Sequence, residues 1–109
     1  RYSDIIEIAK DQIRKTYMSD EISLNTIAAE VGMSPSYFSS IFSKEMGKTF
    51  VEYLTEIRMD RAKELLMCSS MKTSEIGYEV GYKDPHYFSY IFKKTQNCTP
   101  KEFRARGKE

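Results

Sequence analysis

The sequence predicts an all-α fold of about seven helices, in which two copies of one helical unit are joined by a long helix. Apolar residues recur at helical spacing, and no stretch alternates apolar and polar residues as a half-buried strand does. IAAEVG from Ile27 matches IGYEVG from Ile76, and PSYFSSIFSK from Pro35 matches PHYFSYIFKK from Pro85 after one inserted residue. We therefore expect one domain, residues 1–109, comprising a first unit (1–48), a joining helix (49–69) and a second unit (70–109).

Apolar spacing and start signals predict the first helix and the two repeated ones. The first helix is indicated by apolar residues that share one face, namely Ile5, Ile6, Ala9 and Ile13. Each copy then has an apolar trio at i, i+3 and i+4, which marks a buried helix face: Phe38, Ile41 and Phe42, then Phe88, Ile91 and Phe92. These two helices should begin at Ser34-Pro35 and Asp84-Pro85, because each pair supplies an N-cap followed by proline.

Glycines and threonine–glutamate pairs mark the remaining helix ends. Residues that tolerate a left-handed backbone follow several helices, namely Gly32, Gly47, Gly81 and Asn97. Thr49 with Glu52, and Thr99 with Glu102, have the spacing of capping boxes and should each open a further helix. The helix after Thr49 contains no proline or glycine as far as Cys68. At about 1.5 Å per residue it should be about 30 Å long.

Each copy has the residue order of a helix-turn-helix motif. In the first, Ala28 allows two helices to approach closely, Gly32 permits the tight turn and Phe38 packs into the core. The second copy keeps Gly81 and has Gly77 in place of the alanine. The joining helix is close in length to the separation of about 34 Å between successive major-groove faces of B-DNA. Two tandem motifs at that separation favour a DNA-binding protein.

Composition tests this interpretation against the alternatives. A net charge of +1 does not favour nucleic-acid binding, although basic residues outnumber acidic ones from Lys83 onward. The rival is a helical protein-interaction module, whose partner groove would be formed by Met33, Met46, Met59 and Tyr82. The serine-rich outer helix faces favour DNA over such a partner. No nucleophile and base set, glycine-rich phosphate loop or metal-ligand spacing is present, so we expect no enzyme, no cofactor and no metal.

The sequence resembles the AraC/XylS-type transcription regulators over nearly its whole length, from about Tyr2 to Arg106. The resemblance rests on SPSYFSSIFSKEMGKTFVEYLTEIRMDRAKELL and EIGYEVGYKDPHYFSYIFKKTQNCTPKEFR. In finer detail it is similar to the output domain of YesN-like two-component response regulators. It implies a bacterial, cytoplasmic regulator whose partners are a double-stranded DNA operator and RNA polymerase. It also implies an upstream receiver part that can dimerise. Without a signal peptide or long apolar run, we expect no membrane contact.

The resemblance implies that the third and sixth helices enter successive major grooves, and helix geometry identifies the residues opposite the buried trios. The expected base contacts are Ser36, Ser39, Ser40, Ser43, His86, Ser89 and Tyr90. The expected phosphate contacts are Tyr37, Lys44, Tyr87, Lys93, Lys94 and Arg104. Many family members have arginine at the positions of Ser40 and Tyr90. Its absence predicts modest base discrimination, with Tyr90 or His86 packing on a thymine methyl or donating one hydrogen bond.

Overall fold

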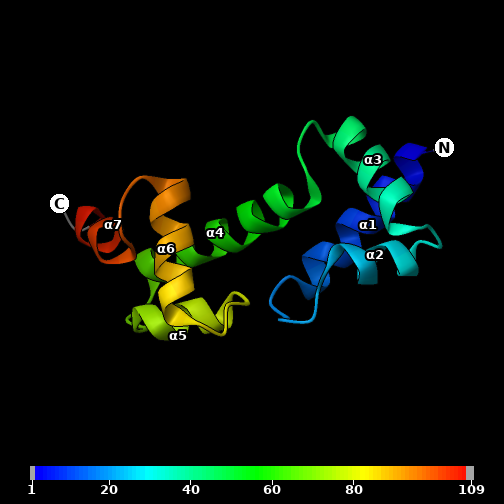
Figure 1. Ribbon diagram of the computed structural model, residues 1–109. Helices are drawn as coiled ribbons and strands as arrows, with labels where there is room; N and C mark the ends of the chain where they lie inside the picture. The colour runs from blue at the N-terminus through cyan, green and yellow to red at the C-terminus, as the bar shows by residue number, and fades with distance from the viewer. Residues whose placement is uncertain (1, 108–109) are drawn as a thin grey trace. The chain divides into compact units, whose positions relative to one another are not determined.

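The computed structural model of the chain describes residues 2–107 and is all-α, as the sequence predicts. Over these residues it contains seven helices and no strand (Figure 1). The helices are α1 (Tyr2–Thr16), α2 (Leu24–Glu30), α3 (Pro35–Met46), α4 (Phe50–Cys68), α5 (Thr73–Glu79), α6 (Pro85–Gln96) and α7 (Pro100–Arg106). The chain forms two compact units, Arg1–Ile57 and Arg58–Glu109, so the division between them falls inside α4.

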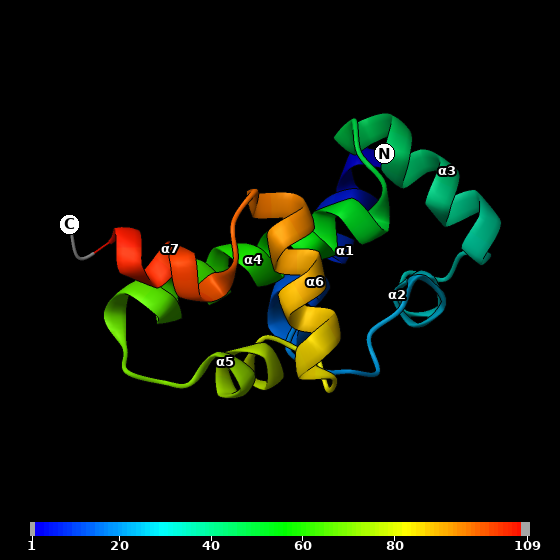
Figure 2. The same cartoon turned by 60° about the vertical axis from the view of Figure 1, so that its left-hand side comes forward.

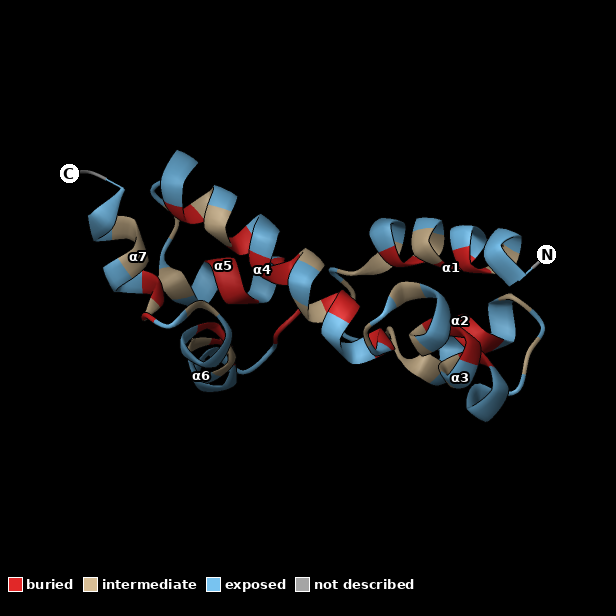
Figure 3. Ribbon diagram, turned by 90° about the horizontal axis from the view of Figure 1, so that it is seen from above, coloured by how far each residue is buried: buried red, intermediate tan, exposed pale blue. Residues whose placement is uncertain are grey.

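The first unit is built around two phenylalanines of α3. Phe38 and Phe42 are fully buried, as expected, and Ile41 is nearly so. Phe42 contacts the rings of Phe50 and Tyr53 from α4, with centroids 6.0 and 5.6 Å apart. The apolar face of α1 closes this core and appears as a buried stripe along the helix in Figure 3. Since a fully buried large apolar side chain contributes about 1.5–3 kcal/mol, these rings fix α3 firmly in the unit.

The second unit repeats this plan with one difference. Phe88 and Phe92 of α6 are fully buried, but Ile91 is only half-buried and packs at the edge of the core. The short helix α7 covers this core through Phe103, whose ring meets that of Phe92 edge-on at 5.8 Å. In Figure 2, α5 leads through a short turn into α6, and α7 follows beyond the far end of α6. The expected inward trio is therefore a buried pair with one partly exposed member.

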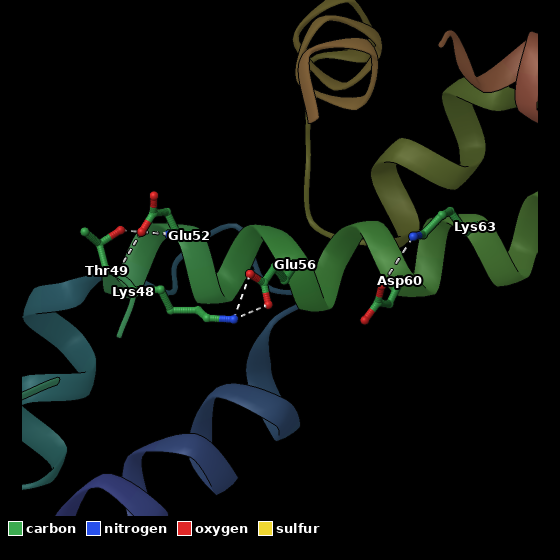
Figure 4. A network of polar contacts seen from close by, with 6 residues as sticks. All are labelled: Lys48, Thr49, Glu52, Glu56, Asp60 and Lys63. Atoms are coloured by element: carbon green, nitrogen blue, oxygen red, sulfur yellow. Dashed lines mark hydrogen bonds and ion pairs between the residues drawn. The ribbon is translucent and has the colours of Figure 1, made fainter. Parts of the chain in front are cut away.

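Both units draw part of their core from α4. Its first half supplies Phe50, Tyr53 and Leu54 to the first core, and its second half supplies Met59, Ala62 and Leu66 to the second. Polar contacts line the outside of the helix in Figure 4, including the ion pairs of Lys48 with Glu56 and of Asp60 with Lys63. The hydrogen bond to Glu56 raises the pKa of the Lys48 ammonium group. The joining helix is thus also a structural part of each unit.

Local capping fixes where α3 and α6 begin and end. The Ser34 hydroxyl accepts a hydrogen bond from the Tyr37 amide at 3.3 Å, and the Asp84 carboxylate accepts one from the His86 amide at 2.9 Å. At the other ends Gly47 and Asn97 have φ of 71° and 65°, which is the left-handed conformation predicted for both. Since the two copies share these caps, α3 and α6 have the same length and register within their units.

Candidate nucleic-acid interface

The outer face of α3 carries small hydroxyl side chains. Ser36 and Ser40 are exposed, whereas Ser39 and Ser43 are half-buried at the borders of the face. Lys44 is also exposed and lies in the last turn of the helix. The residues predicted on this helix therefore lie on one face, and the two serines at its borders are less exposed than the others. Such a face offers hydroxyl donors and acceptors and one cation, with no large side chain among the serines.

Tyr37 lies at the start of α3 beside a residue that the sequence did not indicate. Its hydroxyl is hydrogen-bonded to that of Tyr2 on α1, and the two rings meet edge-on with centroids 6.0 Å apart. Both side chains remain nearly half exposed. The hydrogen bond with Tyr2 raises the pKa of the Tyr37 phenol.

The outer face of α6 is larger and more basic than that of α3. His86, Lys93 and Lys94 are exposed, Tyr90 has 58% of its surface exposed, and Ser89 is half-buried. The Lys94 ammonium lies 5.8 Å from the ring centre of Tyr90. A shallow groove beside Tyr90 is lined by both lysines, Ser89 and Thr99. The aromatic ring and two cations on one helix face place an apolar surface and positive charge side by side, which are the features that contact with bases and phosphates requires.

Arg104 is used differently from the other predicted phosphate contacts. Its Nε donates to the carbonyl oxygen of Leu66 at 3.0 Å, and its Nη2 donates to that of Ser69 at 3.1 Å. These carbonyls lie at and just beyond the C-terminal end of α4, where a cation is favoured by the helix dipole. This arrangement favours a structural role for Arg104.

The partner groove of the rival interpretation is not formed at the surface. Met59 and Tyr82 belong to the second core, and Met33 and Met46 pack partly buried against the first. In the described part of the chain no group of histidine, cysteine, aspartate or glutamate side chains could hold a metal ion. None of the helices over residues 2–107 is both long and apolar enough to cross a membrane.

Comparisons with known proteins identify the family. A family described as a helix-turn-helix domain matches residues 27–106. The C-terminal domain of AraT, a response regulator from Geobacillus stearothermophilus, is 35% identical, with a TM-score of 0.91 over 94% of this chain and 84% of that one. The C-terminal domain of the two-component response regulator yesN from Fusobacterium nucleatum is also 35% identical, with a TM-score of 0.88 over 90% and 95% of the two chains.

This chain is an AraC-type helix-turn-helix DNA-binding domain. An HTH-type transcriptional regulator from Pseudoalteromonas carrageenovora, in the cgkA 5' region, is 36% identical over 100 residues, which are 92% of this chain. The AraC-type domain spans 58% of the length of that regulator and a smaller share of several other curated relatives. The family predicted from the two repeated segments is thereby confirmed.

The AraC-type domain contains its two motifs as α2–α3 and α5–α6, and both turns have the same hydrogen bond. The Met33 amide donates to the Ala28 carbonyl at 2.9 Å, and the Tyr82 amide donates to the Gly77 carbonyl at 2.8 Å. The glycine between each donor and acceptor has a positive φ, 72° at Gly32 and 116° at Gly81. The inserted residue of the second copy therefore lies after this shared turn and before α6.

Two residues that lie beside the predicted sites of the AraC-type domain are not indicated by the sequence. Tyr2 reaches Tyr37 from α1, and Arg58 of α4 lies over the ring of Tyr82 near the start of α6, 4.9 Å from its centre. Neither has a local signal, because each contact joins residues more than twenty positions apart. Only the three-dimensional structure brings them to the motifs.

Proposed function

We propose that α3 and α6 of this domain are its two base-contacting helices and that they occupy successive major grooves of one DNA duplex. The single observation that carries this proposal is the α6 surface, where His86, Tyr90, Lys93 and Lys94 are all exposed on one helix of a helix-turn-helix motif. The base contacts would come from Ser36, Ser39, Ser40, Ser43, His86, Ser89 and Tyr90. The phosphate contacts would come from Tyr37, Lys44, Tyr87, Lys93 and Lys94.

We propose further that the domain is the non-catalytic C-terminal output part of a two-component response regulator. Support comes from the two similar solved structures, which are both C-terminal domains of response regulators. Such a regulator acts on DNA in the bacterial cytoplasm and works with RNA polymerase. Dimerisation would reside in a receiver part upstream of residues 1–109.

A salt series with selected DNA tests the proposed contacts. Oligonucleotides bound by the 109-residue chain are first selected from a random pool, and two conserved boxes about ten base pairs apart are expected. Three lysines on phosphates predict that log K falls with log salt with a slope of about −3. Lys94→Ala should weaken binding to all sequences about equally and reduce this slope by about one.

Variants of exposed residues then separate base contacts from phosphate contacts. Tyr90→Ala should change base preference in one box only, whereas Lys94→Ala should leave preference in both boxes unchanged. Lys15→Ala on α1 is the matched control, since it removes an exposed lysine outside both motifs, and it should leave the slope unaltered. An unchanged base preference in Tyr90→Ala would show that the assignment of the α6 face is wrong.

A further inference from the structure

Aromatic side chains form a continuous row from the core of the second unit to the surface of α6. The ring centre of Tyr82 lies 5.8 Å from that of Tyr87, and the ring centre of Tyr87 lies 6.2 Å from that of Tyr90. Tyr82 is only 9% exposed, whereas Tyr87 and Tyr90 are 50% and 58% exposed. We call these three residues the aromatic row. Its buried end is fixed by the core, and its other end is the proposed base contact.

A cation lies at each end of the aromatic row. At the exposed end Lys94 lies over the ring of Tyr90, 5.8 Å from its centre. At the buried end the guanidinium of Arg58 lies 4.9 Å from the ring centre of Tyr82, and Arg58 is itself only 8% exposed. Attraction between a cation and an aromatic face is strongest where water is excluded, so the Arg58 contact should be the stronger of the two.

The turn before α6 leaves room for the Arg58 guanidinium. A Cβ atom at Gly81 would lie 2.8 Å from three atoms of the Arg58 guanidinium, so a side chain there would displace this group. Arg58 therefore packs directly on the backbone of the turn and on the next residue, Tyr82. Both contacts are within the second unit, and together they connect the middle of α4 to the row that leads to Tyr90.

We propose that Arg58 and Tyr82 are positioning residues for base recognition, which act through Tyr87 to hold the ring of Tyr90 in one orientation on the DNA-facing side of α6. Tyr90 would otherwise be free to change rotamer, because more than half of its surface is exposed. Holding a contact residue in its bound orientation reduces the entropy lost on binding. This inference rests on the proposed contact between Tyr90 and a base.

The first motif has no equivalent of this arrangement. The repeat aligns Tyr82 with Met33 and Tyr90 with Ser40, so only Tyr37 corresponds to a member of the row. A serine hydroxyl can bond to several bases, whereas a fixed aromatic ring favours the C5 methyl group of thymine. We therefore infer that the box bound by α6 contains a thymine recognised by its methyl group, and that the box bound by α3 is more tolerant.

Replacing thymine by deoxyuridine tests this inference, because it removes only the C5 methyl group. At one position in the α6 box, the change should weaken binding of the 109-residue chain about fourfold, the factor expected for one buried methyl group. Tyr90→Ala should abolish this dependence. If no thymine-to-deoxyuridine change in the α6 box weakens binding of the unchanged chain, the proposed Tyr90 contact is wrong, and so is the proposed positioning of Tyr90.

Two variants of Tyr87 test the middle of the row without disturbing the core. Tyr87→Phe removes the hydroxyl, the proposed phosphate contact, and should weaken binding to thymine and deoxyuridine sites alike, but it keeps the ring. Tyr87→Leu removes the ring as well. The fourfold dependence on the thymine methyl should persist in Tyr87→Phe and fall below twofold in Tyr87→Leu. A dependence that is unchanged in Tyr87→Leu overturns the positioning inference while leaving the Tyr90 contact intact.

Variants of Arg58 test the buried end. Arg58→Met keeps much of the side-chain volume but removes the cation, and it should lose the thymine-methyl dependence without altering preference in the α3 box. Arg58→Lys should restore the dependence at least in part, because a cation again lies near Tyr82. If Arg58→Met does not fold, Arg58→Gln takes its place. Arg61→Met, an exposed position on the same helix, is the control for charge and should retain the full dependence.

If all folded Arg58 variants keep a fourfold dependence, Arg58 has no positioning role. If Arg58→Met alters preference in both boxes alike, its effect is a general loss of structure and the inference is also wrong.

Discussion

Gly77 shows how a single missing methyl group allows two helices of the second motif to pack together. A Cβ atom at this position would lie 2.8 Å from Cγ and Cδ2 of Phe88, a ring that is fully buried. Alanine is the better helix former by about 1 kcal/mol. Overpacking a core, however, costs about 1–3 kcal/mol. Gly77→Ala should therefore lower the free energy of unfolding by up to about 2 kcal/mol, as measured by urea denaturation.

A double-mutant cycle identifies the cause of that loss. Phe88→Ala removes Cγ and Cδ2, the two atoms that an alanine at position 77 would meet at 2.8 Å, so the two changes combined should cost less than the sum of their separate effects. Gly47→Ala is a useful control, since no atom lies within 4 Å of a Cβ there and any cost comes from its left-handed backbone alone. A Gly77→Ala chain more stable than the original would contradict this account.

The residues that could be predicted from the sequence are those whose partners lie within one helical turn. Ser34 and Asp84 as N-caps, and Asn97 in a left-handed conformation, follow from local chemistry and are confirmed. The hydrogen bond from Arg104 to the Leu66 carbonyl could not be predicted, because that partner is 38 positions away and leaves no spacing signal. Arg58 was missed for the same reason. Exposure on α3 and α6 was largely predictable, because helical periodicity fixes a face once its core residues are known.

At the scale of helices, the capping box of α7 makes stability depend on pH. The Thr99 amide donates to the Glu102 carboxylate at 2.8 Å, and the Glu102 amide donates to the Thr99 hydroxyl at 3.0 Å. The hydrogen bond from the Thr99 backbone is the largest cause that lowers the pKa of Glu102, and the nearby charges of Lys93 and Arg106 add to it. The folded state therefore favours the carboxylate form more than the unfolded state does.

The sign of the pH effect follows from this difference. Because the folded pKa is depressed, the stabilisation from Glu102 is fully present above its ordinary pKa and is lost as pH falls through the lower, folded value. We expect the midpoint temperature of unfolding to fall less steeply on acidification in Glu102→Gln than in the unchanged chain. Glutamine is a fair comparison, since its oxygen still accepts the Thr99 hydrogen bond. Identical acid profiles for the two chains would show that Glu102 contributes nothing to the pH dependence.

At the scale of the whole molecule, each half of α4 is held in the core of its own unit. Phe50, Tyr53 and Leu54 anchor one half, and Met59, Ala62 and Leu66 anchor the other. At about 1.5 Å per residue its 19 residues extend about 28 Å. A joining segment without glycine or proline resists bending, so the proposed two-box binding should depend on the helical phase between the boxes.

Moving the boxes apart by half a turn of DNA measures this dependence. Five inserted base pairs place the second box on the opposite side of the duplex, and affinity should fall about 100-fold or more, to that of a single box, because the second contact no longer gains from the first.

Replacing both Asp60 and Arg61 with glycine should make α4 more flexible and reduce that loss of affinity, mainly by weakening binding to the correctly spaced site. The matched double alanine variant removes the same two side chains and their ion pairs but keeps a helix-forming backbone. It should keep the full loss of affinity, because the proposed dependence on phase comes from the stiffness of the helix, and charge on its surface plays no part in it. Equal affinities for the two spacings in the unchanged chain would mean that the units bind DNA independently.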